Sequence, residues 1–146
     1  MRTDVAALTR LRGAKDWIDA HYADPVDVTE LAAVAGWSRA HFLRLFAAAY
    51  GETPGAYLTR RRIERAQDLL RSANLTVTEI CLLVGFTSLG TFSRRFTELV
   101  GSSPTEYRAE ARSAGAPPVP GCYLMMWTRP GPKTRLSDKP ADGDRG

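Results

Sequence analysis

Residues 92–107 of this chain read FSRRFTELVGSSPTEY, and residues 42–57 read FLRLFAAAYGETPGAY. The two stretches share Phe, Arg, Phe, Gly, Pro and Tyr at the same intervals and lie 50 residues apart. A short apolar pattern that ends in glycine precedes each copy, at residues 31–36 and 80–85, where the offset is 49. Six matched residue types at five matched intervals indicate an internal duplication, so we expect two similar structural units.

The turn chemistry of each unit predicts a helix, a tight turn and a second helix. Gly36 and Gly85 follow the last apolar residue of a helical pattern. A left-handed residue closes a helix there, and glycine adopts that conformation without steric cost. Ser38, and Thr87 or Ser88, can cap the next helix by accepting hydrogen bonds from its first backbone amides. This order is typical of a helix-turn-helix motif.

Apolar periodicity extends the pattern to an all-α fold of about seven helices. Pro25 separates the first two helices, and Asp27 can cap the second, with Glu30 in the capping-box position. Pro54 pre-sets the first turn of a long linker helix that joins the two helix-turn-helix subdomains. We expect one domain over residues 4–112, with helices at 4–22, 28–35, 39–50, 54–72, 77–84, 89–100 and from Pro104 onward.

The composition changes abruptly after this region. Six of the nine prolines and five of the twelve glycines lie in residues 113–146, which we expect to form an irregular tail. Within it, residues 123–127 (YLMMW) form an apolar island. Three interpretations of the island stay open: it docks against the protein's own helices, it contacts a partner, or it is mobile.

Length and charge limit the possible functions. The 146 residues suffice for one domain of about 110 residues plus a tail, and an enzyme-sized second domain does not fit. The net charge is +4, and 17 of the 20 basic residues are arginine. Residues 31–112 carry eleven basic and seven acidic side chains, so the surplus lies mainly in the duplicated region. Arginine suits recognition of phosphate and guanine because its planar fork binds bidentately.

Cysteine use and hydropathy predict a reduced, cytoplasmic protein. Cys81 and Cys122 are the two cysteines, and neither belongs to a metal-binding spacing, so we expect no metal or cofactor. The N-terminus lacks the apolar run of a signal peptide, and no stretch approaches the ~20 apolar residues of a membrane span.

A helical wheel separates a buried side from an exposed side on the second helix of each unit. Small residues and one arginine on the exposed sides fit a helix that enters a major groove closely and reaches guanine. The predicted buried sides are Phe42, Leu45, Phe46 and Ala49 in the first unit and Phe92, Phe96 and Leu99 in the second. The predicted exposed sides are Ala40, Leu43, Arg44 and Ala47, and Gly90, Thr91, Arg94 and Glu98.

Several features allow a second interpretation. A single exposed arginine is usually a solvated charge, and it is the match between Arg44 and Arg94 that favours base reading. The run at residues 60–62, with Arg65, is either a solvated helix face or a phosphate clamp. His21 and His41 have no nucleophile or carboxylate arranged near them in sequence and are expected to be structural or exposed.

Two other function classes remain open at this point. One is an adaptor that uses its helix-turn-helix units mainly for protein contacts. The other is a small enzyme, such as a DNA-repair alkyl acceptor that uses Cys81 or Cys122. We expect that the chain is not an enzyme.

The duplicated region resembles the DNA-binding domain of the AraC/XylS family of bacterial transcription regulators. The stretches that decide the resemblance are residues 85–96, GFTSLGTFSRRF, and residues 101–108, GSSPTEYR, and the resemblance covers about residues 5–112. It implies seven helices in two helix-turn-helix subdomains. It also implies an activator that inserts its recognition helices, about 39–50 and 89–100, into adjacent major grooves of double-stranded promoter DNA, and that contacts RNA polymerase.

The resemblance also implies which residues contact DNA. Several of them cannot form side-chain hydrogen bonds, and Ala40 and Leu43 can instead pack on thymine methyl groups. We therefore expect each helix to read few bases. The implied base-reading residues are Ala40, Leu43, Arg44, Leu89, Gly90, Thr91 and Arg94, and the expected phosphate contacts are Ser38, Arg39, Arg61, Arg62, Ser88 and Arg95.

We expect the chain to differ from most family members in lacking an effector-binding and dimerisation domain, because its 146 residues leave no room for one. In this respect it resembles the single-domain members of the MarA, SoxS and Rob type. That likeness implies a monomer on one asymmetric site, and no small-molecule effector site is evident from the sequence.

Overall fold

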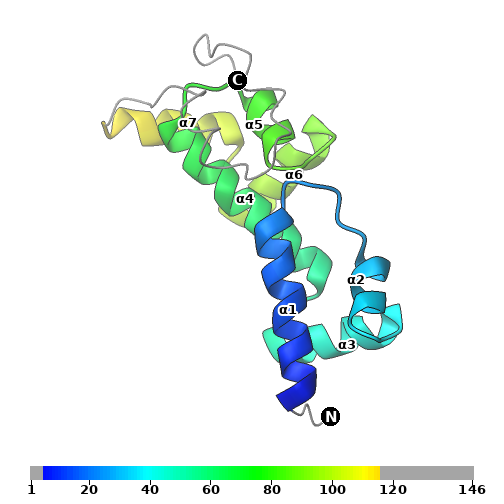
Figure 1. Cartoon of the computed structure of the whole chain (residues 1–146). Coiled ribbons are helices and arrows are strands. Elements are labelled where there is room, and N and C mark those ends of the chain that lie inside the picture. Colours follow the sequence, from blue (N-terminus) through cyan, green and yellow to red (C-terminus); the bar gives the residue numbers. More distant parts are fainter. Residues whose placement is uncertain (1–4, 116–146) are drawn as a thin grey trace. The chain divides into compact units, whose positions relative to one another are not determined.

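The computed structural model describes residues 5–115, and these form seven α-helices (Figure 1). The all-α prediction is therefore confirmed, while the tail, its island at residues 123–127 and Cys122 lie outside the described residues. The helices are α1 (Val5–His21), α2 (Val28–Val34), α3 (Arg39–Tyr50), α4 (Pro54–Ser72), α5 (Val77–Leu83), α6 (Leu89–Val100) and α7 (Pro104–Ser113).

The chain divides into two compact units within α4, the first ending at Arg61 and the second beginning at Arg62. The first unit contains α1, α2, α3 and the start of α4, and the second contains the rest of α4 with α5, α6 and α7. Each unit therefore contains one of the two copies of the duplicated pattern.

The two tight turns have the same backbone hydrogen bonds. Gly36 has φ 84° and Gly85 has φ 109°, so both adopt the left-handed conformation predicted for them. After α2, the N–H of Trp37 donates to Ala32 at 2.9 Å, and after α5 the N–H of Phe86 donates to Cys81 at 3.0 Å. These bonds reach back five residues and close the helix as a Schellman motif. The duplication in sequence is thus a duplication of turn geometry.

Side-chain caps fix the start of each helix after its turn. Ser38 caps α3, and Ser88 rather than Thr87 caps α6. Asp27 caps α2 as predicted, through its carboxylate and the N–H groups of Thr29 and Glu30. Two full capping boxes that were not predicted start α5, with Thr76 and Glu79, and α7, with Ser103 and Glu106.

Aromatic rings form the centre of the first unit. Phe42 and Phe46 of α3 are fully buried, with ring centroids 5.8 Å apart. Tyr57 of α4 packs on Phe46 at 6.0 Å. Leu11 and Ile18 of α1 close the same core. The predicted inner side of α3 is therefore confirmed.

The second unit repeats this arrangement. Phe92 and Phe96 of α6 are fully buried, and Phe96 lies 5.5 Å from the Tyr107 ring, edge to face. The buried side of α4 contributes Ile63, Ala66, Leu69 and Leu70. In each unit, a pair of phenylalanines four residues apart therefore anchors one helix, α3 in the first unit and α6 in the second. The other side of that helix is left for solvent or a ligand.

Leu99 and Arg108 depart from the simple pattern. The prediction that Leu99 is buried is wrong, because 52% of this residue is exposed. Leu99 lies in the last turn of α6, and periodicity gives the direction of a side chain without showing whether another element covers it. Arg108 is buried, 1% exposed, and its Nε donates to the backbone oxygen of Leu70 at 3.4 Å. This arginine therefore tethers α7 to α4 inside the second unit.

Candidate nucleic-acid interface

The outer side of α3 carries the predicted contacts of the first unit. The Ser38 hydroxyl accepts a hydrogen bond from the His41 N–H at 3.1 Å and so begins α3 at Arg39. Arg39, Ala40 and Arg44 are exposed, whereas Leu43 is half-buried. This face therefore presents two exposed arginines, Arg39 and Arg44, and the small residue Ala40, with Leu43 at its edge.

The outer side of α6 is built in the same way. The Ser88 hydroxyl accepts from the Thr91 N–H at 3.2 Å, and α6 begins at Leu89. Leu89 is 43% exposed, Gly90 and Arg94 are exposed, and Thr91 is half-buried. A hydroxyl cap, a small residue and an exposed arginine therefore recur at matching places on α3 and α6.

The arginines of these faces differ in their ion pairs. Arg95 donates to Glu98 at 3.0 Å in an exposed pair, which reduces its net field at the surface. Within residues 5–115, neither Arg44 nor Arg94 has an ion-pair partner. These two side chains therefore remain able to bind a ligand without first breaking a salt bridge.

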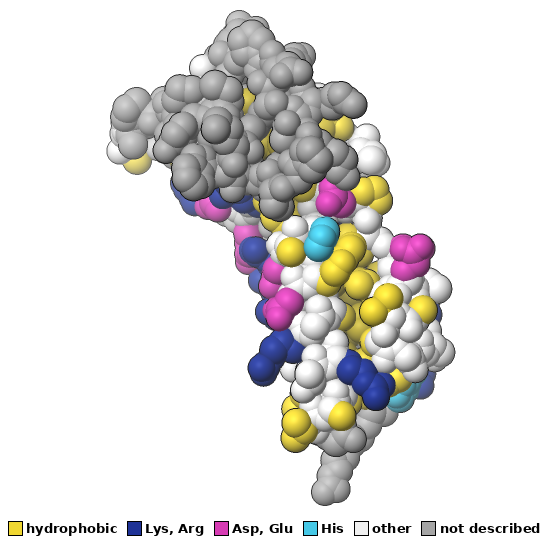
Figure 2. All heavy atoms as spheres, in the orientation of Figure 1, with side chains coloured by type: hydrophobic (Ala, Val, Ile, Leu, Met, Phe, Trp, Pro, Cys, Tyr) yellow, Lys and Arg dark blue, Asp and Glu magenta, His cyan; other side chains and the backbone are white. Residues whose placement is uncertain are grey.

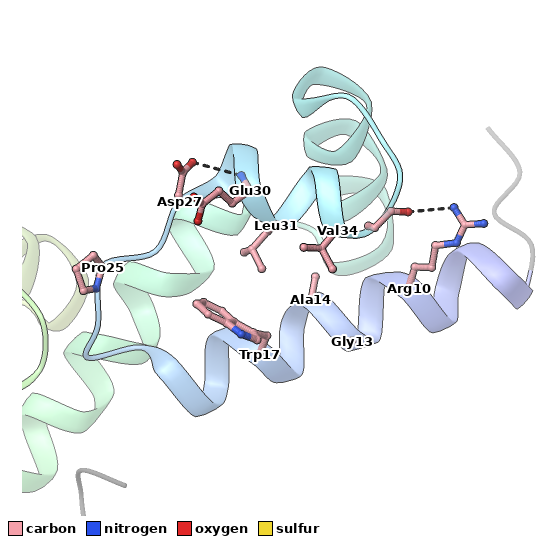
Figure 3. A pocket seen from close by; sticks show the side chains of 10 residues that line it. Arg10, Gly13, Ala14, Trp17, Pro25, Asp27, Glu30, Leu31 and Val34 are labelled. Carbon is pink, nitrogen blue, oxygen red and sulfur yellow. Dashed lines mark hydrogen bonds between the residues drawn. The ribbon is translucent and has the colours of Figure 1, made fainter. Parts of the chain in front are cut away.

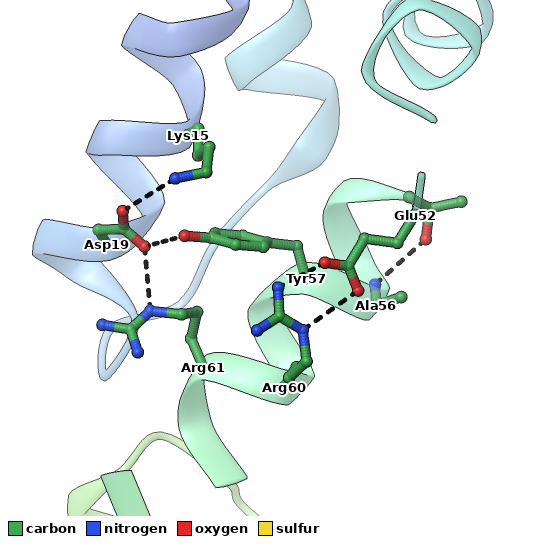
Figure 4. A network of polar contacts seen from close by, with 8 residues as sticks. Lys15, Asp19, Glu52, Ala56, Tyr57, Arg60 and Arg61 are labelled. Carbon is green, nitrogen blue, oxygen red and sulfur yellow. Dashed lines mark hydrogen bonds and ion pairs between the residues drawn. The ribbon is translucent and has the colours of Figure 1, made fainter. Parts of the chain in front are cut away.

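The arginine run on α4 lies within polar networks. Arg61 Nε is 3.1 Å from the Asp19 carboxylate, which also accepts a hydrogen bond from the Tyr57 hydroxyl (Figure 4). Arg60 pairs with Glu52 at 2.6 Å. In the second unit, the Arg62 guanidinium lies 5.7 Å from the centre of the Phe86 ring. The run thus contains structural contacts that the sequence did not reveal, because Asp19 and Glu52 lie in other segments.

Burial raises the pKa of Tyr57 on α4 and of Cys81 on α5. Burial, together with the hydrogen bond to Asp19, raises the pKa of Tyr57, so this hydroxyl stays protonated as the donor. Burial raises the pKa of the Cys81 thiol to about 11. Cys81 is 1% exposed, and a buried thiol that resists ionisation is a poor nucleophile. The alkyl-acceptor hypothesis therefore gains no support at Cys81.

Three further features of the described residues bear on other kinds of site. Residues 5–115 contain no group of three or more His, Cys, Asp or Glu side chains that could hold a metal ion. No helix among them is both long and apolar enough to cross a bilayer. A hollow of about 410 Å³ between α1 and α2 was not predicted from the sequence, because its lining comes from separate segments.

Comparison with known proteins decides the family. A family model described as a helix-turn-helix domain matches residues 31–110. The DNA-binding domain of AdpA, a global transcriptional factor solved in complex with a target DNA, is 34% identical with a TM-score of 0.69, over 72% of this chain and 95% of that one. An AraC-type regulator from Chromobacterium violaceum is 28% identical with a TM-score of 0.66, over 77% of this chain and 100% of that one.

The chain belongs to the AraC/XylS family. It carries the helix-turn-helix, DNA-binding type of domain that transcription regulators of this family carry, as its sequence resemblance implied. The family and the fold are those of transcription regulators rather than of enzymes.

Curated relatives of this AraC-family chain are longer than the part that it matches. The probable transcriptional regulator LumQ of Photobacterium leiognathi is 33% identical over 93 residues, which are 64% of this chain and 38% of LumQ. The right origin-binding protein of Escherichia coli K12 is 30% identical over 128 residues, 87% of this chain and 44% of that protein. The chain thus spans less than half the length of both relatives.

Proposed function

We propose that this AraC-family protein reads promoter DNA with two helices, inserting α3 and α6 into adjacent major grooves. The observation that supports this most strongly is the repeated outer face, in which a hydroxyl cap, a small residue and an exposed arginine recur on both helices. A small residue at the helix start permits close approach to the bases, and arginine binds guanine bidentately. The AdpA complex with a target DNA supports a role for this type of domain on DNA.

The two faces differ in the contacts that they can make. On α3, Arg44 would bind guanine, and Ala40 with the half-buried Leu43 would pack on thymine methyl groups. On α6, Arg94 is the corresponding guanine reader, and Leu89 can contact a methyl group. Gly90 brings the backbone close, and Thr91 offers a hydroxyl. Sequence preference would therefore depend on a few contacts per helix.

Phosphate contacts would orient each helix in its groove. Ser38 and Arg39 lie at the start of α3, and Ser88 lies at the start of α6, where backbone amides and the helix dipole favour an anion. Arg95 can reach the backbone after leaving Glu98. Arg61 and Arg62 complete the proposed set, and in the first unit Asp19 orients Arg61.

Two units in one chain supply two recognition helices without a second copy. We therefore propose that residues 4–112 bind one asymmetric site as a monomer. Activation through contact with RNA polymerase remains part of the same proposal. The family resemblance suggests this contact.

A gel-shift titration on the promoter region upstream of the gene tests the DNA-binding proposal. We expect a salt-dependent complex with a sequence preference, since phosphate contacts release counterions. The variant with both Arg44→Ala and Arg94→Ala should lose the preference while keeping its helical content. An unchanged preference in a folded double variant would contradict the assignment of Arg44 and Arg94 as base readers, and the absence of any sequence-preferring complex with the wild type would favour the adaptor hypothesis.

A further inference from the structure

The first unit contains a hollow that the DNA-binding proposal does not use. It measures about 410 Å³ and lies between α1 and α2, with Ala14 and Trp17 on one side and Leu31 and Val34 on the other (Figure 3). Figure 2 shows apolar side chains gathered along this face of the first unit. The volume falls within the range of small-molecule sites, roughly 300 to 1,000 Å³. It is far larger than the packing gaps of a protein interior.

Apolar surface remains open in this hollow. Val34 is 88% exposed and Trp17 is 38% exposed, although both are large apolar residues. His21 stacks on the Trp17 ring with centroids 4.2 Å apart and planes 15° apart. Its Nδ1 also lies 2.9 Å from the Trp17 backbone oxygen. The indole is therefore held in place by its own helix and is ready to contact a ligand.

The charges at the two ends of the hollow are not equivalent. Arg10 lies at one end, where its guanidinium donates to the backbone oxygen of Ala35 at 3.1 Å and lies 5.3 Å from the centre of the Trp37 ring. Asp27 and Glu30 lie toward the other end, beside Pro25 (Figure 3). Arg10 is held at the carboxyl end of α2 by its bond to Ala35, so its positive charge lies at the opposite end of the hollow from Asp27 and Glu30.

The acidic end carries two carboxylates, Asp27 and Glu30, that have no ion-pair partner within residues 5–115, and the start of α2 offsets only part of their charge. Asp27 accepts hydrogen bonds from the N–H groups of Thr29 and Glu30 through one carboxylate oxygen, Oδ1. In the described part of the chain, the Glu30 carboxylate forms no ion pair and is exposed. An aromatic ring and carboxylates beside an apolar wall are the groups that recognise an organic ammonium ion.

We propose that this hollow binds a small organic cation with an apolar body. The body lies against Trp17, Leu31 and Val34, and the ammonium group lies at the end formed by Asp27 and Glu30. None of the residues proposed to contact DNA lines this hollow, so the site is distinct from the proposed reading faces. The ligand class follows from the charges of the lining, because the two carboxylates at one end outnumber the single cation, Arg10, at the other, and a large ligand would exceed the volume.

Three probes with the same phenylethyl or benzyl body test the proposal on the full chain. They are the cation 2-phenylethylammonium, the neutral 2-phenylethanol and the anion phenylacetate. Indole N–H signals are followed by NMR, and the Trp17 signal is assigned with Trp17→Phe. We expect a saturable shift of the Trp17 signal, with the cation binding about fivefold more tightly than the alcohol and the anion binding most weakly.

Charge-neutralising variants locate the ammonium group. Glu30→Gln should weaken binding of the cation about fivefold and leave binding of the alcohol unchanged. Asp27→Asn should do the same, and because asparagine also caps helices well, α2 should remain folded. Glu110→Gln, which changes an exposed acid on α7, is the matched control and should leave both affinities unchanged.

Three results would overturn the proposal. The first is the absence of a saturable shift of the Trp17 signal with the cation. The second is binding of phenylacetate as tight as that of the ammonium ion. The third is an equal loss of affinity in Glu30→Gln and Glu110→Gln, which would indicate a general charge effect rather than a site.

Discussion

Arg94 and Arg95 are neighbours on α6, yet they meet different partners. Arg95 pairs with Glu98 at 3.0 Å, whereas Arg94 has no ion-pair partner within the described chain. Arg44 on α3 matches Arg94 in position, exposure and lack of an ion pair. At the scale of single residues, these differences separate the proposed base readers from an arginine that orients the helix.

Substituting Arg94 or Arg95 should reduce DNA binding in two different ways. Arg94→Ala should cost about 1 to 3 kcal/mol of binding free energy on the preferred site and relax discrimination at one base pair. Arg95→Ala should weaken binding to all DNA sequences alike. It should also lower, by about 1, the slope of the logarithm of the binding constant against the logarithm of the salt concentration. Competition gel shifts with single-base variants of the site measure both effects. The same uniform loss in both variants would reject the assignment of Arg94 as a base reader and of Arg95 as a phosphate contact.

Gly90 tests how closely the α6 backbone approaches DNA. A Cβ at this position would lie 3.8 Å from the Ser88 hydroxyl, an ordinary contact, so Gly90→Ala should leave the free protein at least as stable. On DNA, the extra methyl group should cost about 1 to 3 kcal/mol by overpacking. Fluorescence anisotropy on a labelled site measures the loss.

Gly55 provides the control, because it is the second residue of α4 as Gly90 is of α6, and a Cβ there meets nothing within 4 Å. Gly55→Ala should keep the affinity for DNA. An unchanged affinity in Gly90→Ala would argue against close approach of α6.

At the scale of elements, the anchoring of α6 separates stability from recognition. Phe96 is fully buried, while Leu99, three residues later, is 52% exposed. Phe96→Ala should therefore lower the free energy of unfolding by about 3 to 5 kcal/mol. Leu99→Ala should change it by no more than about 0.5 kcal/mol, as surface substitutions do. Urea denaturation followed by circular dichroism gives both values, and similar losses in the two variants would contradict this core assignment.

The same elements show what could be predicted from the sequence. Helix ends were predictable because Gly36, Gly85 and the serine caps act on their own neighbours in sequence. The partners of Arg61 and the lining of the hollow depend on segments that meet only in the folded unit, and no local pattern reports them. Leu99 was misjudged for the related reason that periodicity does not show what covers a face.

At the scale of the whole molecule, the duplication supplies two helix-turn-helix units on one chain. Each unit has its own aromatic core and its own outer face, and α4 belongs to both units. The residues that repeat, Phe42 and Phe46 with Phe92 and Phe96, are scaffold. The residues that differ, Ala40 and Leu43 against Gly90 and Thr91, should set which bases each helix prefers.

Selection of bound sequences from a random duplex library, with the wild type and with Arg44→Ala and Arg94→Ala, tests the central proposal most directly. We expect one asymmetric motif with two sub-sites about 10 base pairs apart, the spacing of successive major grooves. Arg44→Ala should remove the preference in one sub-site and Arg94→Ala in the other. A single short sub-site, or loss of the same base pair in both variants, would contradict insertion of two helices.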